Sequence, residues 1–176
     1  ESDRIFKLRN IPDTYKIKDY ITAKECKSAI VIGGGYIGLE MVENLRRTGM
    51  DVTLLQRSNQ VLRNTLDYDM ACLIHKELKK QGVQVYFNQT VTSVEQQGST
   101  ICVKNSDGQT FCADMLILAI GVTPESDLAR NAGLDVAENG CIKVDEHLRT
   151  SNEDIYALGD AIEVTHFVSG LKAHIP

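Results

Sequence analysis

The chain has 176 residues, of which 43% are hydrophobic and 24% are charged, a composition typical of a globular domain with a sizeable core. Its formal net charge of -5, with no basic stripe, argues against a general nucleic-acid-binding protein. No apolar run reaches the length of a membrane span, and no signal-like segment begins the chain. The cysteines are scattered and form no C-x-x-C pair, which predicts a reducing, cytoplasmic protein.

Both ends of the chain look cut. It starts at Glu1 rather than at a methionine, and it stops at Pro176 directly after an irregular tail. We therefore expect a fragment of a longer protein.

The first residues lead into a sheet. Ile5 and Phe6 lie in an extended segment. Asp13 is the predicted N-cap of a short helix that runs to about Ala23 and turns Ile17 inward. We interpret this helix as a packing element.

A strand–helix–strand unit occupies residues 28–57. The apolar run Ala29–Ile32 has the length and β-branched content of a buried parallel strand. The next six residues, Gly33–Gly38, match the G-x-G-x-x-G dinucleotide fingerprint. The predicted helix that follows ends near Gly49, and the run Val52–Leu55 forms the second strand. The apolar face of this helix consists of Ile37, Met41 and Leu45.

Each glycine has a physical role in this interpretation. Gly33 permits a tight turn, Gly35 lets the backbone approach a pyrophosphate, and Gly38 lets the helix pack close to the sheet. Tyr36 and Ile37 open the helix, whose free N–H groups face the anion. The alternative is a glycine-rich turn that binds nothing. The strand before the motif, and the helix and second strand after it, favour a dinucleotide site.

A second helix and a third parallel strand follow the polar loop at residues 58–65. Asp67 is the predicted N-cap of this helix, and Val83–Phe87 is the predicted strand. The predicted apolar face of the helix consists of Met70, Leu73, Ile74 and Leu78.

Three short alternating runs then predict an antiparallel meander. The runs are Val91–Val94, Thr100–Lys104 and Gln109–Cys112. Cys102 and Cys112 would lie opposite each other across the last turn. Because a reducing compartment and cross-strand strain disfavour a bridge, we expect no disulfide there.

The last part of the chain contains shorter elements. Met115–Ile120 is a buried strand that ends at Gly121, and a short helix runs from about Ser126 to Ala132. Two further strands are predicted at Cys141–Val144 and Ile155–Leu158. The four histidines lack the spacing of metal ligands, so we expect no metal site.

Four motifs in this order resemble the central part of the pyridine nucleotide-disulfide oxidoreductases, which are flavoproteins with two dinucleotide sites. The motifs are the turn and helix from Gly33 to Glu40, the meander, Ala119–Pro124 and Thr150–Ala161. Within this family the chain is most similar to the coenzyme A-disulfide reductase and NADH oxidase branch, chiefly over Asp160–Gly170.

The resemblance implies an α/β fold: a Rossmann-like parallel sheet, with helices on both sides and an inserted three-stranded antiparallel meander. It implies that residues 1–145 form an NAD(P)H-binding domain with a lead-in segment. Residues 146–176 would be a truncated return toward an FAD-binding domain. The family's FAD fingerprint and redox-active cysteine motif are absent from these residues, so we expect the chain alone to be inactive. The full-length parent is expected to be a homodimer.

The resemblance also assigns site residues. Ile37 and Gly121 would lie near the nicotinamide nucleotide, and Glu40 would form a hydrogen bond near the nicotinamide carboxamide. Asp160 would contact the ribityl and pyrophosphate region of FAD in the parent. Burial against the sheet explains Ile37 equally well. The alternative for Glu40 is a first-turn glutamate favoured by the helix dipole.

The end of the second strand departs from an NAD-specific site. Such a site places a carboxylate about twenty residues past the first glycine, where it accepts the ribose hydroxyls. Gln56 stands there, followed by Arg57, whose guanidinium can pair bidentately with a 2′-phosphate. The coenzyme A-disulfide reductases that the chain resembles also carry a basic residue here. We therefore favour NADPH, with Arg63 as a second candidate for the phosphate. The alternative is a solvated Arg57 and a site that accepts NADH or both nucleotides.

Together these features predict a domain that presents NADPH to the FAD of the parent, for reduction of a small-molecule disulfide such as coenzyme A disulfide. No nucleic acid and no membrane is expected as a partner. One alternative is an NADH oxidase, which uses the same scaffold to reduce oxygen. Another is a stand-alone nucleotide-binding module, although the Gly159-Asp160 motif argues against it.

Overall fold

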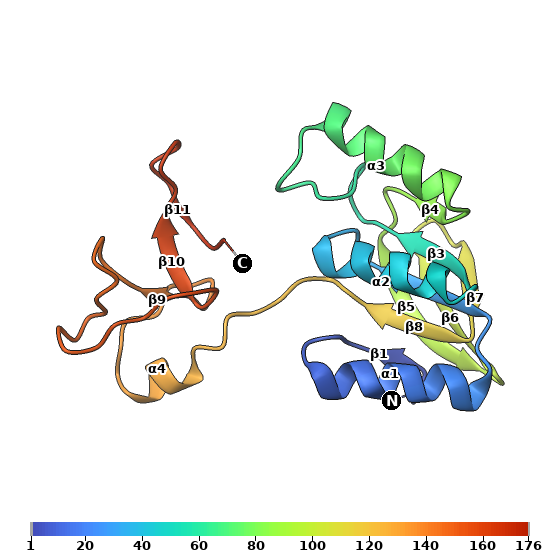
Figure 1. Ribbon diagram of the computed structural model, residues 1–176, viewed down its shortest axis with the longest axis horizontal. Helices are drawn as coiled ribbons and strands as arrows, with labels where there is room; N and C mark the ends of the chain where they lie inside the picture. The colour runs from blue at the N-terminus through green and yellow to red at the C-terminus, as the bar shows by residue number, and fades with distance from the viewer. Residues whose placement is uncertain (1, 176) are drawn as a thin grey trace. The chain divides into compact units, whose positions relative to one another are not determined.

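The computed structural model describes residues 2–175 and divides into two compact units (Figure 1). Unit 1 is Glu1–Gly121 and unit 2 is Val122–Pro176, and each has its own hydrophobic core. The boundary predicted after residue 145 separates an NAD(P)H-binding domain from a return toward an FAD-binding domain. It is not the boundary between these two units, and it stays a prediction. No helix within residues 2–175 combines the length and the apolar character that crossing a membrane requires.

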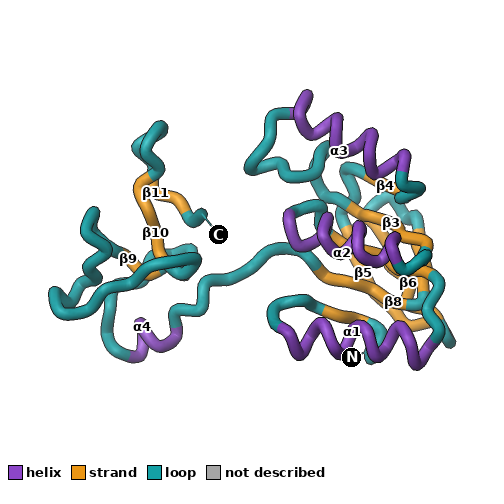
Figure 2. Tube along the Cα trace, viewed as in Figure 1, coloured by secondary structure: helices purple, strands orange, loops and turns teal. Residues whose placement is uncertain are grey.

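Unit 1 is built on a five-stranded parallel sheet with the strand order β1-β8-β2-β3-β4. Figure 2 draws the strands in orange and the helices in purple. Every neighbouring pair in this sheet is parallel. The strands are β1 (Ile5–Phe6), β2 (Ser28–Ile32), β3 (Asp51–Leu55), β4 (Gln84–Tyr86) and β8 (Met115–Leu118). The predicted buried parallel strands and the α/β fold class are therefore confirmed. The central strand β2 has apolar neighbours on both faces, as its continuous apolar sequence predicts.

Three helices cover one face of this sheet. They are α1 (Ile11–Lys24), α2 (Tyr36–Arg47) and α3 (Tyr68–Lys80). Val31, Leu54 and Ile117 point from the strands into this core, where they meet Ile17 of α1 and Val42 of α2. The helices therefore bury every second residue of each central strand.

The antiparallel meander covers the other face. Its strands are β5 (Val91–Gln97), β6 (Thr100–Asn105) and β7 (Thr110–Ala113), which confirms the predicted three-stranded meander. Ile30, Leu55 and Leu116 pack against Ile101 and Val103 of β6. The expectation of helices on both sides is wrong, because the apolar face of the meander occupies the position that a second helical layer would take.

Helix α1 begins earlier than predicted. Its N-cap is Asn10, whose side chain accepts a hydrogen bond from the Asp13 N–H at 3.1 Å. The Asp13 carboxylate in turn accepts the Asn10 N–H at 3.3 Å. Asp13 is therefore the third residue of a capping box and not the cap itself.

The inward face of α3 also differs from the prediction. Met70 and Leu73 are 52% and 61% exposed, whereas Ala71 is fully buried. Ile74 and Leu78 do pack against the core. The face of α3 that packs against the core thus consists of Ala71, Ile74 and Leu78. A small residue marks the closest approach of the helix, and hydrophobicity alone pointed to its larger neighbours.

Unit 2 has a small core of Ala129, Ile142 and Ile162. Its elements are α4 (Asp127–Asn131), β9 (Ile142–Lys143), β10 (Ile162–Thr165) and β11 (Lys172–Ala173), with the strand order β11-β10-β9. The short predicted helix is confirmed, but β10 and β11 were not predicted. The strand predicted at Ile155–Leu158 is wrong: Tyr156 makes one isolated bridge with Arg149, and Leu158 is 72% exposed.

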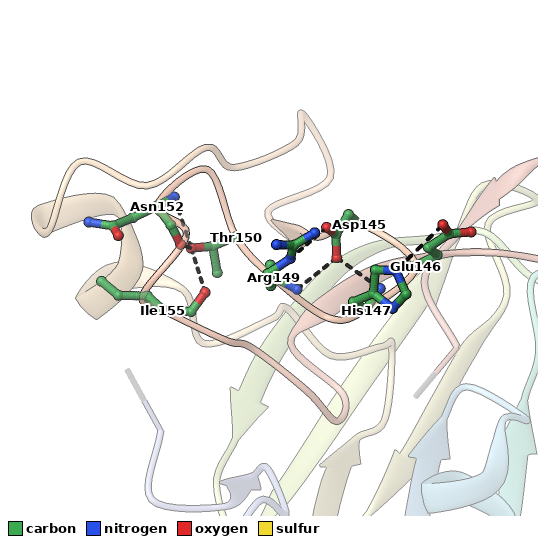
Figure 3. A network of polar contacts seen from close by, with 7 residues as sticks. All are labelled: Asp145, Glu146, His147, Arg149, Thr150, Asn152 and Ile155. Atoms are coloured by element: carbon green, nitrogen blue, oxygen red, sulfur yellow. Dashed lines mark hydrogen bonds and ion pairs between the residues drawn. The ribbon is translucent and has the colours of Figure 1, made fainter.

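Side-chain hydrogen bonds to the backbone hold the segment between β9 and β10 (Figure 3). The Asp145 carboxylate accepts the N–H groups of His147 at 2.8 Å and Arg149 at 2.9 Å, and the guanidinium of Arg149 at 3.1 Å. The Thr150 hydroxyl donates to the carbonyl of Ile155 at 2.9 Å. Two backbone hydrogen bonds, from Thr150 to Ile155 at 2.9 Å and from Ala157 to Leu148 at 3.0 Å, complete the isolated bridge, and the pairing extends no further.

Cys102 and Cys112 form a disulfide, so the expectation of two free thiols at these positions is wrong. They are directly paired across β6 and β7. The sequence placed the two residues opposite each other correctly. The expectation rested on an inferred compartment and on the strain of cross-strand bridges, and neither argument excludes a bond between two directly paired cysteines.

Asp114 ties the beginning of β2 to the β7–β8 junction. Its carboxylate accepts the Lys27 N–H at 2.8 Å, the Ser28 N–H at 2.9 Å and the Ser28 hydroxyl at 2.9 Å. Burial raises the pKa of this carboxyl, but the hydrogen bonds outweigh burial, and the pKa of Asp114 lies below its usual value. The charged form is therefore the one that the fold stabilises.

Replacing this carboxylate should destabilise unit 1. Asp114→Ala leaves two backbone N–H groups without acceptors, and we expect a loss of about 2–4 kcal/mol in urea unfolding at neutral pH. Because the folded pKa is depressed, this contribution should be present above about pH 4 and lost as the pH falls through the folded pKa. Asp51→Ala is the matched control, since Asp51 is 85% exposed and pairs with Arg46 at 3.4 Å. It should cost less than about 1 kcal/mol, and equal losses for the two variants would contradict the assignment.

Candidate functional site

The glycine turn lies at the carboxyl end of β2, between β3 and β8. The Gly33 N–H donates to the carbonyl of Leu55 at 2.9 Å, and a Cβ at Gly33 would overlap the carbonyl oxygen of Ala119. Its φ of 106° lies in the region that favours glycine. A Cβ at Gly38 would overlap the carbonyl oxygen of Gly33. This geometry agrees with the predicted tight turn at Gly33 and close packing at Gly38, and contact with a nucleotide stays a prediction.

The beginning of α2 presents unpaired donors. Gly35 is its N-cap, and a Cβ built there would meet nothing within 4 Å. Among residues 2–175, no hydrogen bond uses the backbone N–H groups of Gly35, Tyr36, Ile37 or Gly38. The first turn of this 12-residue helix contains no acidic side chain. Aligned donors at the positive end of a helix form a site for an anion such as a pyrophosphate.

Gln56 holds the turn from the end of β3. Its amide oxygen accepts the Gly34 N–H at 2.8 Å, and its amide nitrogen donates to the Ser58 hydroxyl at 2.7 Å and the Gln60 carbonyl at 3.0 Å. Ser58 also donates to the Gln60 carbonyl, at 2.7 Å. All hydrogen-bonding groups of the Gln56 side chain are thus engaged by the protein. The role of Gly34, Ser58 and Gln60 was missed, since only the spacing of Gln56 from the first glycine marked this position.

The loop after β3 is anchored to both the turn and α3. The Leu62 N–H donates to the Gly34 carbonyl at 2.9 Å. Val61 is fully buried, and its N–H donates to Nε2 of His75 at 3.3 Å. The His75 ring lies 4.4 Å, centroid to centroid, from that of Phe87. Burial lowers the pKa of His75, which favours the neutral ring that this contact needs as its acceptor. No pattern in the sequence indicated a role for His75.

Two arginines flank this loop. Arg57 is exposed, and its guanidinium has no partner among residues 2–175. The Arg63 guanidinium donates to the Asn59 side chain at 2.9 Å and is also exposed. The structure therefore places both arginines on the loop that follows β3 and leaves the charge of Arg57 available to a ligand.

The other predicted residues of α2 differ in exposure. Tyr36 is the first residue of the helix and is 59% exposed. Ile37 packs at the edge of the helix-side core, as the burial interpretation predicts. Glu40 is exposed and is the fifth residue of α2, so the interpretation as a first-turn glutamate is wrong. Contacts of Ile37 and Glu40 with a nicotinamide stay predictions.

Gly121 and Asp160 belong to different units. Gly121 is exposed, has a φ of 121°, and comes two residues after Ala119, which touches the glycine turn. Asp160 lies in unit 2, is exposed, and accepts a hydrogen bond from the His174 ring on its backbone carbonyl at 2.7 Å. Gly121 thus lies near the turn in unit 1, whereas Asp160 is described only within unit 2.

The chemistry available at the turn is binding, not proton transfer. It consists of free N–H donors, an engaged amide, a serine hydroxyl and two guanidinium groups. Within residues 2–175 no three His, Cys, Asp or Glu side chains are placed to hold a metal ion. The arrangement fits a polyanion that carries a further phosphate.

Comparisons with known proteins agree with this geometry. Residues 1–173 match the family model described as pyridine nucleotide-disulphide oxidoreductase. A coenzyme A disulfide reductase of Staphylococcus haemolyticus is 35% identical over 176 residues, which are 100% of this chain and 39% of the relative. Other curated relatives carry the name NADH oxidase.

Two crystal structures extend the comparison. The reduced Bacillus anthracis protein CoADR-RHD is 48% identical with a TM-score of 0.91, covering 98% of this chain and 30% of that one. An engineered water-forming NADPH oxidase, made from a Lactobacillus brevis oxidase and bound to NADPH, is 35% identical with a TM-score of 0.90. The match covers 100% of this chain and 38% of the oxidase chain. The chain thus spans 30% to 39% of the length of these proteins.

The buried contact between His75 and Val61 should make stability depend on pH. The unfolded chain binds a proton at this residue near pH 6.5, and the folded protein binds it only at lower pH. The contribution is therefore complete above about pH 6.5 and declines as the pH falls below it. We expect the free energy of unfolding of His75→Gln, whose amide can accept the Val61 N–H but cannot titrate, to fall less between about pH 7 and pH 5. Denaturant titrations across this range measure both slopes, and identical slopes would refute the assignment.

Proposed function

Because the chain belongs to the pyridine nucleotide-disulphide oxidoreductase family, we propose that it binds NADPH and presents it to the flavin of a longer FAD-dependent enzyme. In this proposal residues 1–145 form the nucleotide domain, and residues 146–176 return toward the FAD-binding part. The nicotinamide supplies a hydride and the flavin accepts it, so the task of this chain is to hold and orient the dinucleotide.

The observation that carries the proposal is the set of unpaired N–H groups at the beginning of α2. A pyrophosphate would accept hydrogen bonds from the N–H groups of Gly35 and its neighbours, which have no partner among residues 2–175. Gly35 leaves room for it, because no atom lies within 4 Å of the position of a Cβ. Gly33 and Gly38 act indirectly, since they bring the helix start against the sheet.

The residues around Gln56 support NADPH as the nucleotide. An NAD-specific site offers a carboxylate to the ribose hydroxyls, and such a charge repels a 2′-phosphate. Gln56 is neutral, and its amide is committed to Gly34, Ser58 and Gln60. The free guanidinium of Arg57 can then pair with the 2′-phosphate in a charge-assisted contact, with Arg63 as a second cation on the same loop.

The engineered NADPH oxidase supplies independent support. It carries five substitutions. The first replaces a glycine with alanine, and the second replaces an aspartate with alanine 18 positions later. The two positions directly after that aspartate become arginine and serine, and the position five residues after the serine becomes arginine. In this chain Gln56 lies 18 positions after Gly38 (56 minus 38), Arg57 and Ser58 follow, and Arg63 comes five positions later. The chain thus lacks the aspartate and carries the two arginines and the serine. Of the five substituted positions the chain differs from that protein at two: Gly38 stays glycine, and Gln56 stands where the engineered protein has alanine.

The proposed electron acceptor of the full-length enzyme is a small-molecule disulfide such as coenzyme A disulfide. Support comes from the relative named coenzyme A disulfide reductase and from the higher identity to CoADR-RHD, 48%, than to the oxidase, 35%. The oxidase remains the second candidate because it shares the same fold at a TM-score of 0.90. In both cases the nucleotide site of this chain has the same task.

A side chain at Gly35 should block the dinucleotide without disturbing the fold. Since the position is open and its φ is -82°, Gly35→Val is tolerated by the backbone but projects into the space of the pyrophosphate. We expect calorimetric titration to show no NADPH binding to Gly35→Val, a partial loss for Gly35→Ala, and native circular dichroism for both. Undiminished affinity in the valine variant would place the nucleotide elsewhere.

Removal of the free guanidinium should change nucleotide preference. We expect Arg57→Ala to weaken NADPH binding by about tenfold or more, equivalent to about 1.4 kcal/mol, and to leave NADH binding nearly unchanged. The matched control is Arg47→Ala, because Arg47 is also exposed but pairs with Glu43 on α2. It should leave both affinities unchanged. Equal losses of NADPH and NADH affinity in Arg57→Ala would reject recognition of the 2′-phosphate by this residue.

A further inference from the structure

The meander carries a disulfide that the nucleotide site does not use. Cys102 of β6 and Cys112 of β7 are directly opposite, with their Cα atoms 4.1 Å apart. The Asn105 N–H donates to the Gln109 carbonyl at 3.0 Å, so hydrogen-bonded pairs alternate with non-hydrogen-bonded ones from that point along the ladder. The cysteine pair falls at a non-hydrogen-bonded position, where opposing side chains are closest.

The two sulfur atoms differ in access to solvent. Along β6 the flanking residues Ile101 and Val103 point into the core beneath the meander, so Cys102 and Cys112 lie on its outer face. Cys102 is only 4% exposed, and its sulfur lies 3.9 Å from the hydroxyl of Thr100. Cys112 is exposed. Cys112 is therefore the residue of the pair that a small molecule in solution can approach, whereas Cys102 is covered.

The remaining cysteines within residues 2–175 have no sulfur partner. Cys26 and Cys141 are buried, and burial raises the pKa of each thiol, which makes them poor nucleophiles. Cys72 is half-buried on α3. Exchange with small thiols is thus expected at the meander pair and not at these positions.

We propose that Cys112 and Cys102 form a thiol–disulfide exchange site for small-molecule thiols and disulfides, entered at Cys112 and resolved by Cys102. This assignment rests on the register and exposure of the pair and is independent of the proposed nucleotide function.

The exchange balances in both directions. In oxidation, the Cys112 thiolate attacks one sulfur of a small disulfide, forms a mixed disulfide and releases one small thiolate. The Cys102 thiolate then attacks the Cys112 sulfur, closes the cross-strand bond and releases the second. The two protons lost by the cysteine thiols pass through solvent to the two released thiolates. In reduction, a small thiolate attacks the Cys112 sulfur and Cys102 leaves as a thiolate. A second small thiolate then attacks the small-molecule sulfur of the mixed disulfide, which forms a small disulfide and releases Cys112 as a thiolate, and the two protons of the small thiols pass through solvent to the two cysteines.

The exchange has a structural consequence for β7. In the order β5-β6-β7 this strand is an edge strand of the meander, and it pairs with β6 alone. It runs directly into Asp114, which holds the beginning of β2. The state of the disulfide thus decides whether this edge strand is attached to β6 by hydrogen bonds alone or by a covalent bond as well.

The test follows tryptic peptides of the full-length native protein, so that cysteines elsewhere do not interfere. Cys102 lies on the peptide of residues 81–104 and Cys112 on that of residues 105–130. The reduced protein is incubated with glutathione disulfide, blocked by alkylation and digested. We expect the two peptides to be recovered joined, and to separate again when reduced glutathione is added without denaturant. Two free-thiol peptides after oxidation would overturn the proposal, and so would a bond that opens only in denaturant.

Single variants test the order of attack. Cys102→Ser should accumulate a glutathione adduct on Cys112, because no second thiol resolves it. Cys112→Ser should acquire an adduct on Cys102 at least about tenfold more slowly, since that sulfur is covered. Cys72→Ser is the control and should leave the joined peptides unchanged. Equal adduct rates in the first two variants would overturn entry at Cys112.

Discussion

The close approach of the glycine turn to strand β8 is the constraint on which the nucleotide site depends. The carbonyl of Ala119 occupies the place where any Cβ at Gly33 would stand, and the carbonyl of Gly33 does the same at Gly38. These two contacts fix where α2 begins, and therefore which way its first N–H groups point. Because those donors have no partner within residues 2–175, the start of the helix is available to an anion such as the proposed pyrophosphate.

Gln56 links this turn to nucleotide choice. A carboxylate at the end of β3 would serve the ribose, but it would leave the Ser58 and Gln60 contacts without a donor from this position. The amide instead donates to both and still accepts the Gly34 N–H. The same side chain thus supports the turn and keeps a negative charge away from the adenosine half. In the proposed site, support of the turn and tolerance of a 2′-phosphate would both follow from Gln56 standing where an NAD-specific site has a carboxylate.

How far the sequence predicts this structure depends on how local each signal is. Period and turn chemistry identify β2, α2, β3 and the meander, because apolar alternation and glycine positions are properties of short segments. Helix faces were less certain: Ala71 is buried whereas Met70 and Leu73 are not, since closest approach selects a small residue. The run from Ile155 forms only an isolated bridge at Tyr156, and its apolar sequence does not reveal that Leu158 is exposed. Contacts such as Val61 to His75 join segments 14 residues apart, and no local pattern signals them.

The two arginines of the proposed phosphate site would contribute differently to phosphate binding, because the side chain of Arg63 is hydrogen-bonded to the protein and that of Arg57 is not. Arg63 is oriented by Asn59, so its side chain has already lost part of the freedom that ligand binding would remove. Arg57 has no such partner in residues 2–175 and must be ordered by the phosphate itself. The loop that carries both is anchored through Val61 to a histidine whose neutral form is favoured by burial. Loss of the hydrogen bond between Val61 and His75 would displace Arg63 more than Arg57. Arg57 directly follows Gln56 at the end of β3, whereas Arg63 lies beyond Val61 on the loop. Selectivity for the 2′-phosphate should therefore depend chiefly on Arg57, which lies next to the sheet, and Arg63 should adjust the strength of phosphate binding.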